Sequence, residues 1–135
     1  MSQIQWHGNG RRPVVLVVDD NSAIRDMVSW ALELDGFEPA EAIDGQAALD
    51  WMSNAAREGR YPTVILLDLA MPGMDGRAFL QQIRQQCQIP PQPEPMVVVI
   101  TANVEAPDAT TLGVAHVMVK PFHVRDLLNV VRKLL

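Results

Sequence analysis

Five residues that could do chemistry each follow an apolar run in this 135-residue chain. They are Asp19, Asp20, Asp68, Thr101 and Lys120. Taken singly, each has an ordinary structural explanation, because an aspartate after a strand often caps the next helix and a lysine is usually a solvated charge. Parallel strands, however, bring their carboxyl ends to one crevice, where such sheets bind ligands. If the apolar runs are parallel strands, all five residues fall at one edge of the sheet.

The three aspartates at that edge predict a bound cation. Like charges at close range raise one another's pKa, whereas a divalent cation allows all three carboxylates to ionise. Oxygen ligands without a nearby histidine or cysteine favour Mg²⁺, which typically keeps water and phosphate oxygens among its ligands. The matching chemistry is phosphoryl transfer, in which Asp68 attacks, Lys120 and the cation neutralise charge, and the Thr101 hydroxyl donates to a phosphoryl oxygen.

The remaining sequence predicts the sheet that this site needs. Strands are expected over residues 14–18, 37–42, 63–67, 96–100 and 116–119. Between them, apolar residues recur at helical spacing, and Asn21 or Ser22 can cap the first helix while Gly36 can end it. Strands alternating with four or five helices indicate an α/β fold with a parallel sheet covered on both faces.

Composition narrows the class of protein further. An apolar content of 48% over this length favours one globular domain, expected over residues 13–135 behind a flexible polar head at 1–12. The single cysteine, Cys87, excludes a disulfide framework, and no apolar stretch suits a membrane span or a signal peptide. A net charge of -5 with scattered basic residues argues against direct nucleic-acid binding. We expect a soluble, cytoplasmic protein without a membrane contact.

Five motifs in order carry a resemblance to a known family. VLVVDD, AIDG at residues 42–45, ILLDLAMPGMDG, VVVITA and VMVKPF together resemble the receiver domains of two-component response regulators, over essentially the whole chain from residue 14 to 135. The resemblance implies a flavodoxin-like, doubly wound sheet of strand order 2-1-3-4-5. It also implies a phosphoryl donor, either a sensor histidine kinase or a histidine phosphotransfer protein, and a downstream effector protein.

The resemblance assigns roles to individual residues. Asp68 is the expected phosphoacceptor, Asp20 and Asp68 are expected to bind Mg²⁺ directly, and Asp19 to act mainly through water. The backbone carbonyl of Ala70 is expected as a further metal ligand. Lys120 is expected to pair with the acidic site and then with the phosphoryl group, and the peptide bond that follows it to be cis. Such a domain is not an enzyme in the usual sense, although it assists its own phosphorylation and slow dephosphorylation.

Two features depart from the family pattern. Receivers usually carry an aromatic residue three positions before the lysine, and here that position is Val117, a small and stiff side chain that should weaken the threonine–aromatic coupling. His116 is a poor substitute, because neighbours on a strand face opposite sides. The segment 101–120 is also short and poor in helix formers, which predicts a short or irregular fourth helix and a switch that orders a mobile loop over 101–107.

Two alternatives remain beside a phosphorylated switch. A degenerate receiver could bind a partner regardless of phosphorylation, and Val117 together with the irregular helix favours this reading. An aspartyl phosphatase is disfavoured, because Ala70 occupies the position of that class's general acid and base, and neither Ala70 nor Asn103 supplies a base that activates water. We expect the output to lie in another protein or in another part of a longer chain.

Overall fold

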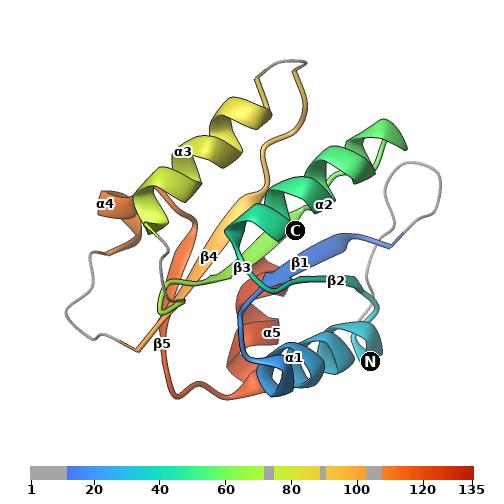
Figure 1. The fold of residues 1–135 in the computed structure, drawn as a ribbon. Coiled ribbons are helices and arrows are strands. Elements are labelled where there is room, and N and C mark those ends of the chain that lie inside the picture. The colour runs from blue at the N-terminus through green and yellow to red at the C-terminus, as the bar shows by residue number, and fades with distance from the viewer. Residues whose placement is uncertain (1–11, 72–74, 89–90, 103–107) are drawn as a thin grey trace.

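Five parallel strands and five helices alternate along the chain in the computed structural model, which describes residues 12–71, 75–88, 91–102 and 108–135 (Figure 1). In chain order they are β1 (Val14–Val18), α1 (Ser22–Leu34), β2 (Glu38–Ala42), α2 (Gly45–Arg57), β3 (Val64–Asp68), α3 (Gly76–Gln86), β4 (Met96–Thr101), α4 (Ala109–Leu112), β5 (His116–Val119) and α5 (Val124–Lys133). The strands form one sheet of order β2-β1-β3-β4-β5. The predicted α/β class and strand order are confirmed.

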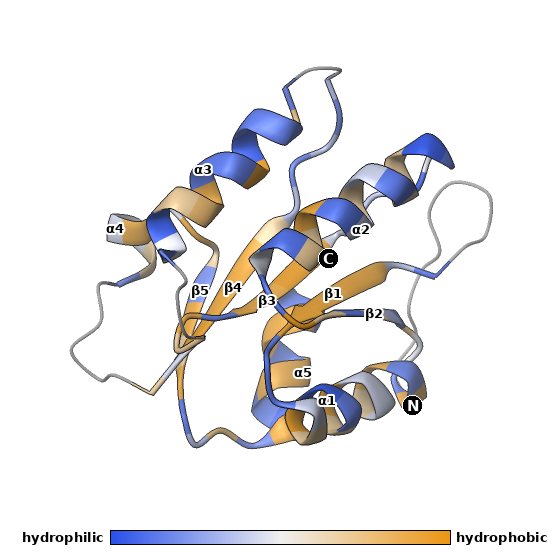
Figure 2. Cartoon of the chain, in the orientation of Figure 1, coloured by the Kyte–Doolittle hydropathy of each residue, from blue (hydrophilic) through white to orange (hydrophobic). Residues whose placement is uncertain are grey.

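The helices cover the sheet on both faces, as Figure 1 shows, with α2, α3 and α4 on one side and α1 and α5 on the other. Alternate residues of β1 serve the two layers, since Leu16 packs with the first group and Val17 with the second. Every residue of β1 and β3 is buried. A strand buried on both faces needs apolar residues at successive positions, and Figure 2 shows these central strands as the most hydrophobic part of the chain.

Side-chain caps fix where the helices begin. The Asn21 carboxamide accepts the N–H of Ile24 at 3.2 Å, so the predicted cap of α1 is confirmed. At the other end of α1, Gly36 adopts a φ of 94°, a left-handed conformation that glycine enters at little cost. Asp44 caps α2 in the same way by accepting the N–H of Ala47 at 2.8 Å. Both helices are therefore bounded by residues whose local preferences agree with the fold.

The sequence signal of β2 is weak because β2 is an edge strand. Its residues Glu38, Pro39 and Glu41 are polar or lack an N–H, which an edge strand tolerates because one side has no partner strand. Glu38 pairs with Arg60, and Glu41 with Arg25 of α1. Charged side chains and proline on an edge also discourage pairing with a further strand.

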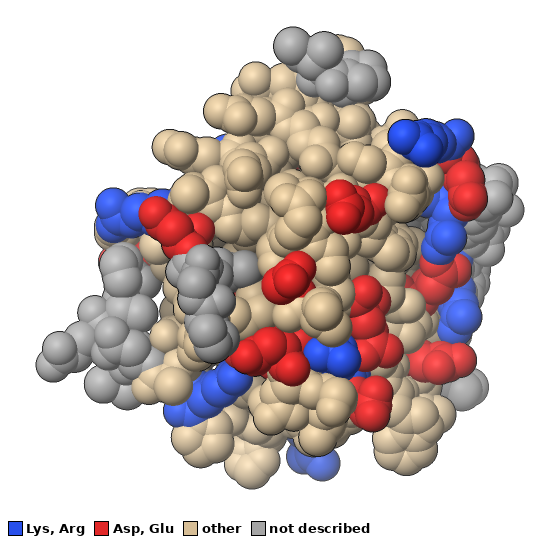
Figure 3. Space-filling model, viewed as in Figure 1, with Lys and Arg blue, Asp and Glu red and all other residues tan. Residues whose placement is uncertain are grey.

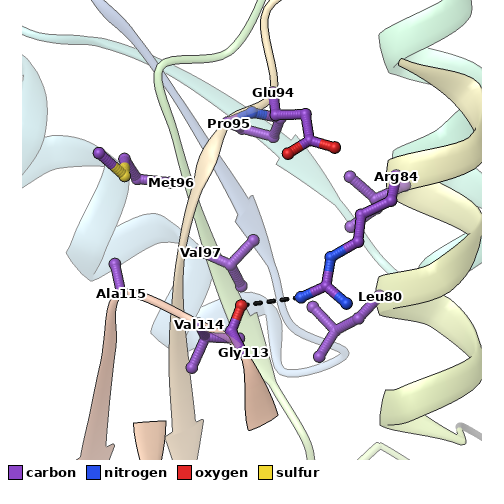
Figure 4. Close-up of a pocket in the computed structure, with 10 residues that line it drawn as sticks. Leu80, Arg84, Glu94, Pro95, Met96, Val97, Gly113, Val114 and Ala115 are labelled. Carbon is purple, nitrogen blue, oxygen red and sulfur yellow. Dashed lines mark hydrogen bonds between the residues drawn. The ribbon is translucent and has the colours of Figure 1, made fainter. Parts of the chain in front are cut away.

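The fourth helix is short, as the sequence predicted. It spans four residues, is capped by Asp108 and ends at Gly113, whose φ of 71° is again left-handed. Arg84 of α3 donates to the Gly113 carbonyl at 2.8 Å, across a cavity of about 340 Å³ between α3 and the start of β4 (Figure 4). Leu112 is buried and belongs to the same apolar cluster as Leu80 and Ile83 of α3. α4 is thus anchored to the body of the domain by one apolar side chain and one hydrogen bond.

Several predictions fall outside the described residues. They concern most of the polar head, Asn103, and most of the loop at 101–107. Among the helices that the structure describes, none combines the length and apolar character required to cross a lipid bilayer.

Candidate functional site

Three carboxylates meet where β1 and β3 end. Asp19 and Asp20 follow β1 directly, and Asp68 is the last residue of β3, which pairs with β1 in the sheet. One ligating oxygen from each lies within 4.8 Å of the others. Asp19 and Asp68 are each only 3% exposed, whereas Asp20 is exposed. The structure therefore brings together the three acids that the sequence placed at one edge.

Backbone hydrogen bonds fix one oxygen of each buried acid. Asp19 Oδ1 accepts the N–H of Asn21 at 2.8 Å, and Asp68 Oδ1 accepts the N–H of Ala70 at 2.9 Å. Each bond closes a tight turn after the strand, because donor and acceptor are two residues apart. The other carboxylate oxygen of each residue, Oδ2, lies within 4 Å of the Lys120 ammonium. The expectation that the Ala70 carbonyl binds a metal stays a prediction.

Lys120 supplies the positive charge of the site. Its Nζ lies 3.2 Å from Asp68 Oδ2 and 3.8 Å from Asp19 Oδ2. The backbone holds Lys120 beside β4, since its N–H donates to the Thr101 carbonyl at 2.7 Å. The Lys120–Pro121 peptide bond is cis, as the family resemblance predicted. Thr101, 5% exposed, is thereby placed next to the lysine at the same edge of the sheet.

The electrostatics of the site fit a hard divalent cation. Burial raises the pKa of Asp19, and the nearby charges of Asp68 and Asp20 raise it further, against the opposing effects of the Asn21 N–H and of Lys120. Three carboxylates thus face a single ammonium group. An all-oxygen donor set of this kind, partly exposed through Asp20, suits Mg²⁺, which binds through one or two carboxylates and retains water.

The position at which receivers usually carry an aromatic residue lies at the margin of the core. Val117 is half-buried and packs against the apolar cluster beneath α2, α3 and α4, while its neighbour Met118 belongs to the cluster on the opposite face. His116 is exposed at the start of β5. The side chain in the aromatic position is therefore a small one that packs against the core.

Sequence reasoning missed one contact of the acidic turn. Arg25 of α1 donates from Nη1 to the backbone carbonyl of Asp19 at 2.7 Å and from Nε to Glu41 Oε1 at 3.3 Å. One signal was present, because a cation near the start of a helix opposes the helix macrodipole and requires some other compensation. Its acceptors, however, are a loop carbonyl and a residue 16 positions away, which no local pattern indicates.

The surface offers no continuous positive patch on the side seen in Figure 3. Lys and Arg side chains there are interspersed with Asp and Glu, in keeping with the net charge of -5. A protein that grips a phosphate backbone concentrates its basic residues on one face. On the face shown, the described residues lack that arrangement.

Comparison with protein families places this geometry among known domains. The family model described as response regulator receiver domain matches residues 15–132. The phosphate regulon transcriptional regulatory protein PhoB of Escherichia coli K12 is 33% identical over 116 residues, covering 84% of this chain and 47% of PhoB. The probable transcriptional regulator ycf27 of Porphyridium aerugineum is 32% identical over 124 residues, covering 90% and 47%. The chain spans about half the length of these curated relatives.

Solved structures share the same fold. The chemotaxis protein CheY4 of Vibrio cholerae superposes with a TM-score of 0.73 at 33% identity, over 92% of this chain and 99% of that one. The CheX–CheY–BeF₃–Mg²⁺ complex from Borrelia burgdorferi matches with a TM-score of 0.76 at 25% identity, over 92% and 90% of the two chains. The strand order, the acidic cluster and the lysine thus occur here in a fold that is well represented among solved proteins.

Proposed function

The chain belongs to the family of response regulator receiver domains, and we propose that within this domain Asp68 accepts a phosphoryl group in a Mg²⁺-dependent reaction. One observation carries the proposal. Asp68 is a buried carboxylate with an oxygen within 4.8 Å of oxygens from two further acids, and its Oδ2 lies 3.2 Å from the Lys120 ammonium. This arrangement supplies a nucleophile, a place for a cation and a fixed positive charge in one cluster, which is what phosphoryl transfer requires.

The proposed metal site consists of Asp20 and Asp68 as direct ligands, Asp19 acting mainly through water, and the Ala70 carbonyl. Bound Mg²⁺ would neutralise the charge that develops on the transferred phosphoryl group. The relatives support this assignment, since the Borrelia burgdorferi CheY structure and that of TrrA from Thermotoga maritima both contain Mg²⁺ with a beryllium fluoride. Asp20 and Asp68 present hard oxygen donors of the type that Mg²⁺ selects.

The reaction that we propose transfers a phosphoryl group from a phosphohistidine to Asp68. A carboxylate oxygen of Asp68 forms the new O–P bond as the P–N bond breaks, and the leaving imidazole keeps the electron pair and takes up a proton. Lys120, which pairs with the carboxylate before transfer, then pairs with a phosphoryl oxygen, and the Thr101 hydroxyl donates to another. The donor is a sensor histidine kinase or a histidine phosphotransfer protein, and a downstream effector protein reads the product.

The domain is proposed to hold its phosphoryl group rather than turn it over. A base that activates the attacking water accelerates hydrolysis of an acyl phosphate. The residue two positions beyond the nucleophile is Ala70, whose side chain is a methyl group and whose N–H is already donated to Asp68. Within the domain, the chemistry therefore extends to its own phosphorylation and slow dephosphorylation, and not to turnover of a separate substrate.

Intact-protein mass spectrometry after incubation with acetyl phosphate and Mg²⁺ tests the proposal. The wild type should gain one phosphoryl mass, and Asp68→Asn should gain none. Asp75→Asn is a matched control, because Asp75 is an exposed acid whose side chain caps α3 by accepting the N–H groups of Arg77 and Ala78. Chelation of Mg²⁺ should abolish the gain. Equal labelling of wild type and Asp68→Asn, or no labelling at all, would contradict the proposal.

A second candidate is a receiver that binds its partner irrespective of phosphorylation. Val117, which stands in the position of the usual aromatic residue, and the four-residue α4 favour it, because both differ from the elements that usually transmit the signal. A ligand shifts an equilibrium only if it binds the two states differently. Amide NMR spectra with and without beryllium fluoride and Mg²⁺ distinguish the two: shifts confined to the acidic site indicate the module, whereas shifts reaching α4 and β5 indicate the switch.

A further inference from the structure

Arg25 connects the acidic turn to the rest of the fold. Its guanidinium donates to the backbone carbonyl of Asp19 at 2.7 Å, with a second nitrogen 3.3 Å from the Glu41 carboxylate of β2. The side chain is only 15% exposed. A planar guanidinium can serve two acceptors in a fixed geometry, which a lysine in the same place could not do. The two contacts thus tie α1, β2 and the turn after β1 together at one point.

The turn that Arg25 contacts carries two of the proposed metal ligands. The backbone N–H of Asp19 donates to the Ala42 carbonyl at 3.1 Å, and the Asp19 side chain accepts the N–H of Asn21 at 2.8 Å. The Asp19 carbonyl is the remaining polar backbone atom of that residue, and it accepts from Arg25. Both backbone polar groups of Asp19 are therefore fixed from outside the turn. Asp20, the exposed acid, has its position set by this residue on one side and by the cap residue Asn21 on the other.

The positive charge of Arg25 is, by itself, unfavourable at this position. A cation near the first turn of a helix opposes the macrodipole, and a cation close to a metal site repels Mg²⁺. Glu41 offsets both effects by pairing with the guanidinium. Because Glu41 neutralises the charge of Arg25, the remaining contribution of Arg25 is its hydrogen bond to the Asp19 carbonyl.

We infer that Arg25 is a positioning residue of the acidic site, which holds the Asp19 carbonyl so that Asp19 and Asp20 stay at the separation that Mg²⁺ binding requires. The inference rests on the proposed function. Carboxylates within 4.8 Å of one another repel, so a turn released from Arg25 spreads until the cation gathers the ligands again. Loss of the contact should therefore weaken Mg²⁺ binding and leave the transfer step unchanged once the metal is bound.

Two substitutions at position 25 separate hydrogen bonding from packing. Arg25→Met keeps an unbranched apolar stem and removes every donor, and it should raise the dissociation constant for Mg²⁺ about tenfold. Arg25→Lys keeps the charge and one donor group, and should fall between the wild type and Arg25→Met. Arg132→Ala is the matched control, since Arg132 also contacts the α1 region through an arginine–aspartate pair, 2.7 Å from Asp35 at the other end of the helix. Its dissociation constant should equal that of the wild type.

Isothermal titration with Mg²⁺ alone measures these constants, and acetyl phosphate labelling at saturating Mg²⁺ measures the transfer step. The inference predicts weaker Mg²⁺ binding by Arg25→Met with a labelling rate within about twofold of wild type at saturation. The inference is overturned if Arg25→Met binds Mg²⁺ as tightly as the wild type, or if Arg132→Ala weakens Mg²⁺ binding as much as Arg25→Met does. It is also overturned if Arg25→Met is labelled much more slowly than the wild type at saturating Mg²⁺. A wild type that takes up no phosphoryl group contradicts the proposed function instead, so the two failures are distinct.

Discussion

The Lys120 ammonium lies 3.2 Å from the Asp68 carboxylate, although 52 residues separate the two in the chain. The strand order brings them together, because Asp68 pairs with Ile100 of β4, and Thr101 of β4 pairs with the residue before Lys120. The carboxyl ends of three adjacent strands thus carry an acid, a hydroxyl and an amine at one edge. Removal of any one group therefore changes the electrostatics of the other two.

Lys120→Met should have opposite effects on the metal and on the reaction. The ammonium lies 3.2 and 3.8 Å from two acids, so its removal leaves their negative charge to Mg²⁺ alone, and Mg²⁺ should bind more tightly. Phosphoryl uptake should slow by about a hundredfold, because a fixed positive charge at the transferred group is lost. Calorimetry and the time course of acetyl phosphate labelling measure the two. Weaker Mg²⁺ binding by Lys120→Met would contradict this account.

Asp19→Asn should stabilise the metal-free protein and weaken metal binding. Burial and neighbouring acids raise the pKa of Asp19, so its ionised form is held at a cost when no cation is present. We expect a gain of about 1 kcal/mol in the free energy of unfolding in the presence of a chelator, as substitutions at strained functional sites often give. Urea denaturation measures it, with Asp26→Asn of the exposed face of α1 as control. At saturating Mg²⁺ the wild type should instead have the higher free energy of unfolding.

Gly113→Ala and Gly59→Ala form a matched pair. Both glycines have a φ of 71°, so an alanine at either position should cost about 1 kcal/mol of backbone strain. At position 59 an added Cβ meets nothing within 4 Å, whereas at position 113 it lies 2.8 Å from Arg84 Nη2, which donates to the carbonyl of the same residue. Gly113→Ala should therefore be the more destabilising by about 1 kcal/mol. In an Arg84→Met background that extra cost should vanish in urea denaturation.

The Asp108 cap makes the stability contributed by α4 depend on pH, and the lowered pKa of Asp108 fixes the direction. The backbone N–H and then the hydroxyl of Thr111 lower the pKa of the Asp108 carboxyl below its ordinary value of 3.8. A lowered folded-state pKa means that the capping interaction contributes fully above 3.8 and is lost as pH falls through the folded-state value. The difference in unfolding free energy between wild type and Asp108→Ala should be constant above about pH 5 and shrink toward about pH 3. A difference that grows on acidification would contradict this assignment.

The sequence predicted the bounds of two strands and placed those of the other three within one residue, for a physical reason. β1, which is buried along its whole length, and β5, which lies at one edge of the sheet, begin and end where the pattern indicated, because an apolar run and a polar stop mark each of them. β2 starts at Glu38 and not at Phe37, since its polar edge residues leave the boundary undefined and Phe37 is buried ahead of the strand. β4 extends to include Thr101, which pairs with Val119 across the sheet. Strand ends at a site depend on pairing, which a single run does not encode.

Part of the site could also be predicted from the sequence, and part could not. The acids and Lys120 could be predicted because their residue types follow strands, and parallel topology gathers strand ends. The contact of Arg25 with the Asp19 carbonyl and that of Arg84 with the Gly113 carbonyl could not, because both acceptors are backbone atoms that carry no residue-type signal. Such contacts become visible only when the turn geometry and the helix positions are known together.

Locating the phosphoryl group on the chain tests whether Asp68 is the phosphoacceptor. Borohydride reduces an aspartyl phosphate to homoserine, and tandem mass spectrometry then identifies the modified residue. Cleavage after arginine releases residues 61–77, a peptide that contains both Asp68 and Asp75 and so carries its own internal control. We predict homoserine at position 68 alone, formed only when acetyl phosphate and Mg²⁺ are both present. Homoserine at position 75, 19 or 20, or an unmodified position 68 in labelled protein, would contradict the account.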